Sequence, residues 1–217
     1  MKIKSSLIIC LLVIFSLLFA SCTSDNPQNI KTTSKNSLTE LIWEDDNFIP
    51  GDKYDWMMSS EEFMEKVYGS ERMNPNSDKF EEYRYGEMEN GMLTLSPPTA
   101  VRLKDNDFIA NTTYLFNEGG ELIKVVYRAV CPGDEIDKYT RTLDSLIQEV
   151  DSIDNLTAQP RDFQSAADAG LLENQVSAKW DNTEYGSYIQ ITSAYFQDNL
   201  ILDLILSVDN QLYIQRN

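Results

Sequence analysis

Apolar and polar residues alternate along much of this chain, and the period of the alternation changes from one segment to the next. From Phe80 to Val130 the period is two, with turn-forming residues between the runs, which predicts an antiparallel β-meander. Its clearest part is a hairpin in which 114–116 and 121–127 flank an Asn-Glu-Gly-Gly turn. Further strands are expected at about 176–182, 187–196, 199–208 and 211–215.

Other segments follow the 3.6-residue period of a helix. Ser59 and Glu62 form a capping box before a helix expected at about 60–68. A longer apolar stripe predicts a helix at about 135–153 that lies across the sheet, and a short helix is expected at 162–169. The order of helix, strands, helix and strands predicts an α+β fold, an antiparallel meander with two main helices packed on one face.

The first 21 residues have a different pattern, in which Lys2 and Lys4 precede an apolar run from Leu7 to Phe19. This is typical of a secretory signal, since about 13 apolar residues at about 1.5 Å each are too short for a bilayer core of about 30 Å. Cys22 directly follows Phe19-Ala20-Ser21 and resembles the lipobox cysteine of bacterial lipoprotein precursors. The resemblance implies that Cys22 is lipid-modified. The alternatives are a freely secreted protein and a retained membrane anchor.

The residues after Cys22 predict a tether. Residues 22–39 contain no aromatic side chain and few apolar ones, so they are expected to be flexible, and a single folded domain is expected over 40–217. Two or three lipid chains would make the attachment stable. We therefore expect a bacterial protein anchored by lipid in the cell membrane or the outer membrane, facing the periplasm or the exterior. Its only membrane contact would be that lipid.

The chain is strongly acidic, with 18 basic and 35 acidic residues and a formal net charge of −17. Removal of residues 1–21 would take away two lysines and no acid, leaving 16 basic and 35 acidic residues and a charge of −19. This charge argues against binding to nucleic acid and against adsorption on anionic lipid. The expected partner is another protein of the envelope or of the extracellular space, steered by the partner's basic surface.

The sequence offers little catalytic chemistry. It has no histidine, which removes the commonest general base and the usual zinc ligand. Cys131 lies before Pro132 at a strand-to-helix junction, a position that lowers the pKa of a thiol, and the alternative is a buried structural cysteine. Acidic runs such as 105–107 lack the spacing of a calcium loop. We expect no enzyme activity, no cofactor and no metal site.

The candidate binding residues lie near the C-terminus. Trp180, Tyr185 and Tyr188 alternate with polar residues, among them Glu184, around an expected hairpin turn. Aromatic side chains with polar neighbours suit the anchor of a protein interface or the contact with a sugar ring. The alternative is that Trp180 and Tyr188 point into the core and only Tyr185 is exposed.

A further resemblance concerns the first helix and the meander. The segment from Trp56 to Phe63 (Trp-Met-Met-Ser-Ser-Glu-Glu-Phe), with Val67-Tyr68-Gly69 and the later hairpin at 114–116, resembles small lipoprotein modules of the SmpA/OmlA (BamE-like) and β-lactamase-inhibitor-like group. Met57 stands where that group has glycine. The resemblance implies a non-enzymatic envelope protein that binds other proteins. The predicted function is a membrane-anchored protein-binding lipoprotein, and the alternative is a lipoprotein that binds a small molecule or a glycan.

The lipid anchor is directly testable. Replacing Cys22 with alanine should abolish partitioning into the detergent phase, because alanine has no thiol to carry lipid. Detergent phase separation of cell extracts measures this, with Cys131→Ala as the matched control that should partition like the parent. Equal partitioning of the Cys22→Ala variant and the parent would contradict the lipoprotein prediction.

Overall fold

The computed structural model describes residues 31–42, 56–68, 86–87, 93–96, 99–154, 156–159, 162–164, 175–182, 186–196 and 199–208. The chain divides into two compact units, Met1–Ile30 and Lys31–Asn217. The first unit lies outside the described residues, and so do the predicted signal and Cys22. The structural description therefore concerns the second unit.

The second unit begins earlier than the sequence predicts. Strand β1 (Lys31–Lys35) pairs in parallel with β4 (Thr99–Leu103). Helix α2 (Leu38–Ile42) follows, and its three large apolar side chains are buried. The predicted tether is therefore wrong for residues 31–39, and the domain does not begin at residue 40. Strand β1 cannot be recognised from its polar sequence. It is ordered by backbone pairing with β4 and by the burial of the α2 side chains that follow it.

Helix α3 (Ser60–Tyr68) has the predicted span. The Ser59 hydroxyl oxygen accepts a hydrogen bond from the backbone N–H of Glu62 at 3.2 Å, as the capping box predicts. Just before the helix, Met57 has a φ of 67°, in the left-handed region that favours glycine. The backbone N–H of Met57 donates to the carbonyl oxygen of Leu122 at 2.9 Å. This contact joins the start of α3 to the meander.

The predicted hairpin is present and forms the long part of the meander. In its turn, Gly120 has a φ of 76°, which would strain any other residue, and the Asn117 side-chain oxygen accepts the backbone N–H of Glu121 at 2.9 Å. The meander strands besides β4 are β2 (Gly86–Glu87), β3 (Leu93–Leu95), β5 (Phe108–Phe116) and β6 (Leu122–Pro132).

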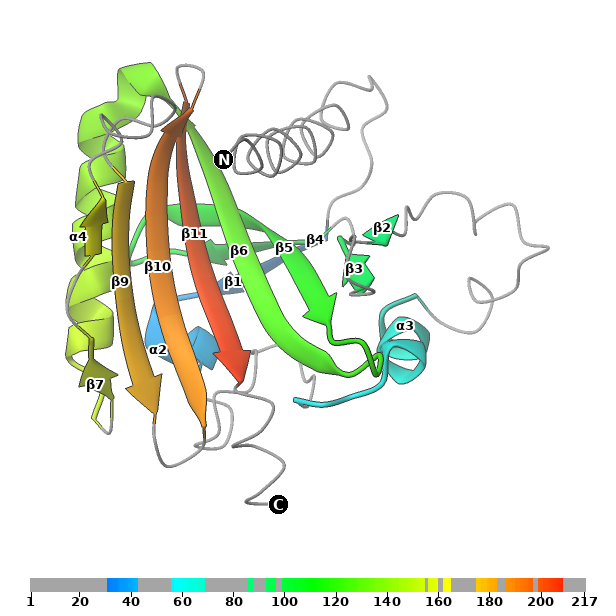
Figure 1. Cartoon of the computed structure of the whole chain (residues 1–217). Helices are drawn as coiled ribbons and strands as arrows, with labels where there is room; N and C mark the ends of the chain where they lie inside the picture. The colour runs from blue at the N-terminus through cyan, green and yellow to red at the C-terminus, as the bar shows by residue number, and fades with distance from the viewer. Residues whose placement is uncertain are drawn as a thin grey trace, which may run out of the picture. The chain divides into compact units, whose positions relative to one another are not determined.

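Helix α4 (Ile136–Asp151) follows β6 through a 3₁₀ turn at Gly133–Glu135, close to the predicted span of 135–153. Its apolar stripe faces the protein interior, as the sequence predicts. Figure 1 shows α4 running alongside the C-terminal strands. The buried members of the stripe are Tyr139, Leu143, Leu146, Ile147 and Val150.

The C-terminal strands agree with the sequence in three places and differ in one. Residues 162–164 form strand β8 beside β9, so the helix predicted at 162–169 is wrong there, because pairing with a neighbouring strand outweighs local helix propensity. The strand predicted at 211–215 lies outside the described residues. The strands after α4 are β7 (Thr157–Ala158), β8 (Asp162–Gln164), β9 (Gln175–Asn182), β10 (Ser187–Phe196) and β11 (Asn199–Val208).

The described strands form one sheet in the order β1-β4-β5-β6-β11-β10-β9-β7, with β3 also on β5 and β8 also on β9. The β1–β4 pair is parallel, and every other pairing among the described strands is antiparallel. The fold is therefore α+β with a largely antiparallel sheet, which confirms the predicted class.

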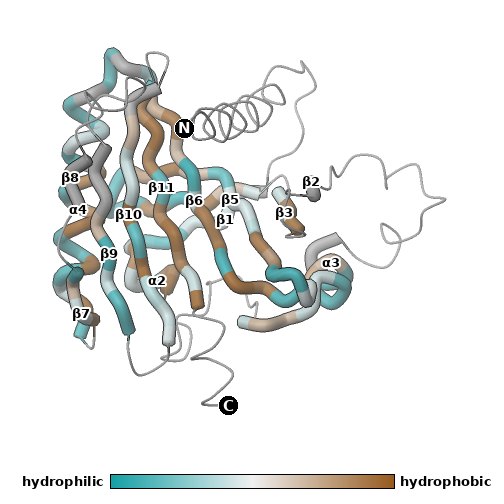
Figure 2. The backbone as a smooth tube through the Cα atoms, in the orientation of Figure 1, coloured by the Kyte–Doolittle hydropathy of each residue, from teal (hydrophilic) through white to brown (hydrophobic). Residues whose placement is uncertain are grey.

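Successive side chains of each strand point to opposite faces of the sheet. One face, here called the core face, is completely buried at its centre, where Leu204 lies opposite Tyr127 and Leu206 lies opposite Val125. Phe63 of α3 belongs to the same core, with its ring centroid 4.5 Å from that of Tyr114. Figure 2 shows how hydrophobic residues concentrate on β6 and β11.

Truncation of the core should be costly. Leu204 is completely buried, so Leu204→Ala should lower the free energy of unfolding by about 2–5 kcal/mol through lost transfer energy and a residual cavity. Urea denaturation measures this loss. The matched control is Ile205→Ala on the same strand, whose half-buried side chain points to the opposite face and should cost less. A loss below about 1 kcal/mol for Leu204→Ala would show that this face is not the packed one.

Candidate functional site

The aromatic segment near the C-terminus is less exposed than the binding prediction requires. Trp180 is 2% exposed, and its indole Nε1 donates to the Asp151 carboxylate at 2.8 Å. The indole therefore ties β9 to the end of α4, and the expectation that Trp180 anchors a partner is corrected. A large aromatic at an inward position of a strand is buried because it supplies more core area than any other side chain.

Tyr188 is half-buried, and its ring already has a partner. The ammonium group of Lys179 lies 4.4 Å from the centre of the Tyr188 ring and 2.9 Å from the Asp181 carboxylate. These three residues therefore support one another on neighbouring strands. Tyr185 and Glu184 lie outside the described residues, so their role as binding residues stays a prediction. The structure does not assemble Trp180 and Tyr188 into one exposed site.

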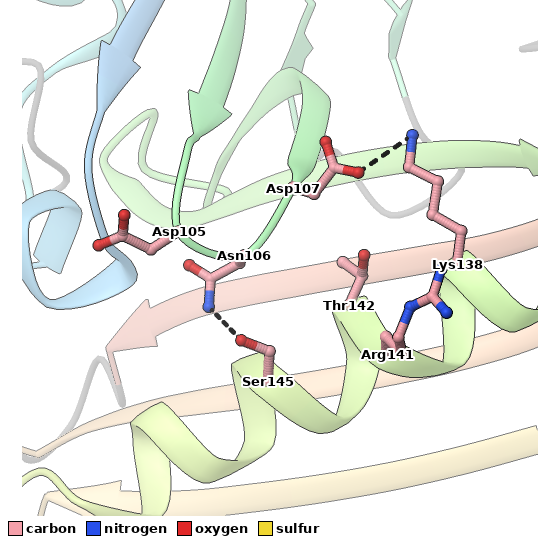
Figure 3. A pocket seen from close by; sticks show the side chains of 7 residues that line it. All are labelled: Asp105, Asn106, Asp107, Lys138, Arg141, Thr142 and Ser145. Carbon is pink, nitrogen blue, oxygen red and sulfur yellow. Dashed lines mark hydrogen bonds and ion pairs between the residues drawn. The ribbon is translucent and has the colours of Figure 1, made fainter.

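A small cavity of about 210 Å³ lies between the β4–β5 turn and α4. Figure 3 shows the turn residues facing one side of the helix. The sequence shows this turn only as an acidic run, and nothing in its pattern indicates the contact with the helix. The lining residues are Asp105, Asn106, Asp107, Lys138, Arg141, Thr142 and Ser145.

The cavity is lined by both signs of charge. Lys138 pairs with Asp107 at 3.2 Å, and this hydrogen-bonded partner raises the pKa of Lys138. Arg141 makes no ion pair with any residue that the structure describes. The amide of Asn106 donates to the hydroxyl of Ser145 at 3.0 Å. Such a lining suits a small polar molecule, and it holds no nucleophile beside a general base.

Glu149 of α4 lies next to this cavity and connects three elements: α4 itself, α2 and the β4–β5 turn. Its carboxylate accepts hydrogen bonds from the backbone N–H and the hydroxyl of Thr39 in α2, at 2.8 and 2.9 Å. It also accepts one from the Asn106 amide at 3.0 Å. Burial by itself raises the pKa of Glu149, but the hydrogen bonds from Thr39 and Asn106 outweigh it, so the pKa is lowered.

The second face of the sheet, here called the outer face, lies opposite the core face. It is unusual because β11 carries apolar residues on both of its faces: Ile201 and Ile205 alternate with the core leucines. The sequence carries this signal in the run Leu-Ile-Leu-Asp-Leu-Ile-Leu. The outer-face residues include Ala100, Arg102, Ile109, Asn111, Thr113, Leu115, Lys124, Val126, Arg128, Val130, Lys179, Asp181, Tyr188, Gln190, Thr192, Ala194, Ile201, Asp203, Ile205 and Ser207.

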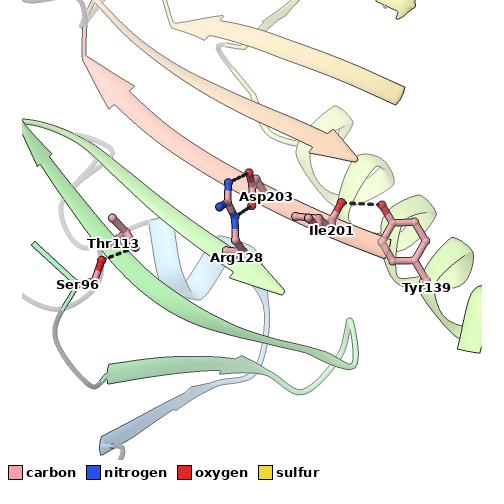
Figure 4. A network of polar contacts seen from close by, with 6 residues as sticks. All are labelled: Ser96, Thr113, Arg128, Tyr139, Ile201 and Asp203. Carbon is pink, nitrogen blue, oxygen red and sulfur yellow. Dashed lines mark hydrogen bonds and ion pairs between the residues drawn. The ribbon is translucent and has the colours of Figure 1, made fainter. Parts of the chain in front are cut away.

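An ion pair lies in the middle of the outer face, between Arg128 of β6 and Asp203 of β11 (Figure 4). It has two parallel hydrogen bonds, from Arg128 Nε and Nη2 to the two carboxylate oxygens, at 2.7 and 2.6 Å. The two side chains are 26% and 13% exposed. The hydrogen bond to Asp203 raises the pKa of Arg128. The pair fixes the register of the two strands where both are apolar around it.

An apolar row crosses the outer face next to this ion pair. Val130 lies opposite Ile201, which lies opposite Ala194. The pairing of β5 with β6 ends at Asn111 and Arg128, and Ile109 and Val130 each lie two residues beyond that pair on their own strands. Ile201 is buried, whereas Ile109 is 52% exposed and Val130 is 48% exposed. An exposed apolar row on the solvent side of a sheet is typical of a protein contact surface.

Cys131 has the opposite acidity to the one predicted. The thiol is half-buried, and burial is the largest cause that raises its pKa, followed by the nearby charge of Glu135. The helix-terminus argument fails because a 3₁₀ turn with two acidic residues separates Cys131 from α4. A raised pKa disfavours the thiolate form of Cys131.

Comparison with known proteins adds no assignment, since the chain matches no family model and no curated protein. Within the described ranges, no group of three or more His, Cys, Asp or Glu side chains is placed to hold a metal ion. No helix in that part of the chain is long and apolar enough to cross a membrane.

The Glu149 contacts predict an acid-dependent loss of stability. Because the folded pKa of Glu149 lies below its unfolded value, the charged carboxylate stabilises the fold above that unfolded value, and this contribution is lost as the pH falls through the folded pKa. The parent should therefore be more stable than Glu149→Gln at about pH 7, with a smaller difference at about pH 3. Urea denaturation at both pH values measures this. A difference that does not change with pH would contradict the assignment.

Proposed function

We propose that this protein is a membrane-anchored envelope lipoprotein that works as a non-enzymatic protein-binding module, and that its outer face holds the partner. The observation that carries the proposal is the two-sided apolar strand β11 together with the half-exposed Ile109 and Val130. A strand at the centre of a sheet with apolar side chains on both faces favours a covered surface on each of them.

The arrangement of the helices supports the choice of this face. We propose that α3 and α4 both pack on the core face. The ring of Phe63 of α3 packs against that of Tyr114 at an interplanar angle of 55°, and the Tyr139 hydroxyl of α4 donates to the carbonyl oxygen of Ile201 at 3.2 Å. The outer face is then the one on which neither of these helices lies. A partner would bury the apolar row around the Arg128–Asp203 pair.

The proposed attachment follows the sequence. Cys22 would carry the lipid, with the folded unit facing the periplasm or the exterior. The chain from Cys22 to Lys31 is then the connection to the bilayer, shorter than the predicted tether because β1 belongs to the fold. A short connection keeps the outer face within reach of other envelope proteins.

The alternative is a protein that binds a small polar molecule in the cavity between the β4–β5 turn and α4. The observation in its favour is Arg141, a cation on the lining without an ion pair to any described residue. The cavity is small and partly occupied by the Lys138–Asp107 pair, so the outer face is the better supported site.

Charged substitutions on the exposed apolar row test the protein-binding function. Ile109→Asp combined with Val130→Asp should abolish the crosslinks that the parent forms in intact cells, because two carboxylates would have to be buried in the interface. The matched control adds the same charge at exposed positions of α4, Thr140→Asp with Gln148→Asp, and should crosslink like the parent.

Crosslinked products are compared by mass spectrometry, and thermal melting establishes that both double variants are folded. Loss of the same partners in both variants would indicate a nonspecific effect of charge. Unchanged crosslinks in the Ile109 and Val130 variant would place the protein partner on another surface and contradict the outer-face site.

A further inference from the structure

The outer face differs in charge from the rest of the protein. The whole chain has a formal net charge of −17. The outer-face residues whose side chains the structure describes, in contrast, include four basic and two acidic ones. The basic ones are Arg102, Lys124, Arg128 and Lys179, and the acidic ones are Asp181 and Asp203.

Two of these cations are bound within the face and two are not. Arg128 pairs with Asp203, and Lys179 pairs with Asp181. Arg102 and Lys124 make no ion pair with any residue in the described ranges. Each has an apolar neighbour: Arg102 lies opposite Ile109, and Lys124 lies opposite Leu115.

The two available cations lie at opposite ends of the apolar region. Lys124 and Val130 are six positions apart on β6, which is about 20 Å at about 3.3 Å per residue. Arg102 belongs to the Val130 end, because its neighbour Ile109 and Val130 lie on the same side of the Asn111–Arg128 pair. The apolar surface is therefore flanked by positive charge at both ends.

We propose that the occupant of the outer face is an extended segment of another protein in which apolar residues alternate with carboxylates. This replaces the basic partner surface expected from the charge of the whole chain, because the local charge of the outer face is positive. The proposal rests on the proposed function and names the chemistry of its partner. The apolar residues would cover Val126, Val130 and Ile109, and the carboxylates would meet Arg102 and Lys124. A second copy of the chain fits poorly, because it would bring another net-basic face and a second large negative charge.

The salt concentration determines the distance over which charges of the protein act on such a partner. At about 0.01 M salt the screening length is about 30 Å, so an acidic segment is repelled by the charge of the whole chain. At about 0.15 M it is about 8 Å, and the local cations of the outer face dominate. Binding of an acidic apolar segment should therefore strengthen between these salt concentrations and weaken again at about 1 M, where local attraction is also screened.

The test uses two fluorescent peptides, one with valine alternating with glutamate and one with valine alternating with lysine. Each is titrated by anisotropy against the whole protein in neutral detergent micelles, with empty micelles as a blank. At about 0.15 M salt the glutamate peptide should bind more tightly than the lysine peptide. Arg102→Gln with Lys124→Gln should weaken the glutamate peptide about three- to tenfold.

The control double variant, Lys35→Gln with Lys66→Gln, removes the same charge from β1 and α3 and should leave affinity unchanged. Tighter binding of the lysine peptide, or an unaltered affinity in the Arg102 and Lys124 variant, overturns the proposed partner chemistry. The protein-binding function survives that result if the Ile109 and Val130 variant still loses its crosslinks. If those crosslinks persist, the outer face is not the surface that binds the partner.

Discussion

The sheet depends on the burial of β11 on both of its faces. The strand lies between β6 and β10, and it is registered with each of them along nearly its whole length. Its leucines pack on the core face, while Ile201 and Ile205 belong to the outer face. Sliding β11 by one residue would exchange the two sets and break the Arg128–Asp203 hydrogen bonds, so the ion pair selects one register between two apolar alternatives.

Polar contacts fix the position of α4 against this sheet. The Tyr139 hydroxyl is bound to a carbonyl oxygen of β11, and burial raises the pKa of this tyrosine to about 12. At the other end of the helix, Asp151 accepts the Trp180 indole, and Glu149 joins α2 and the β4–β5 turn. Hydrophobic packing alone would let the helix rotate or slide. These directional contacts prevent such movement. They connect one helix to β9 and β11 and also to the β4–β5 turn, which lies in the other half of the strand order.

Sequence periodicity predicted the elements whose side chains alternate or repeat strongly. Strands β10 and β11 and helix α3 have the expected bounds because apolar spacing and a capping box define them locally. Strand β1 has a polar sequence and is ordered by pairing with β4, nearly seventy residues later in the chain.

The candidate sites are harder to predict from the sequence. A tryptophan among polar residues, such as Trp180, is compatible with exposure to solvent and with burial in the core. The pairing of Arg128 with Asp203 depends on the register of two strands that are far apart in the sequence.

The parallel pairing of β1 with β4 has a mechanical consequence. In the proposed lipoprotein, any tension from the bilayer enters the folded unit at Lys31, the first residue of β1. Tension along the strand axis loads the five registered positions between β1 and β4 together, in shear, instead of opening them one after another. The buried helix α2 directly follows β1 in the chain. In such a lipoprotein, the first strand of the folded unit would thus resist extraction by membrane drag.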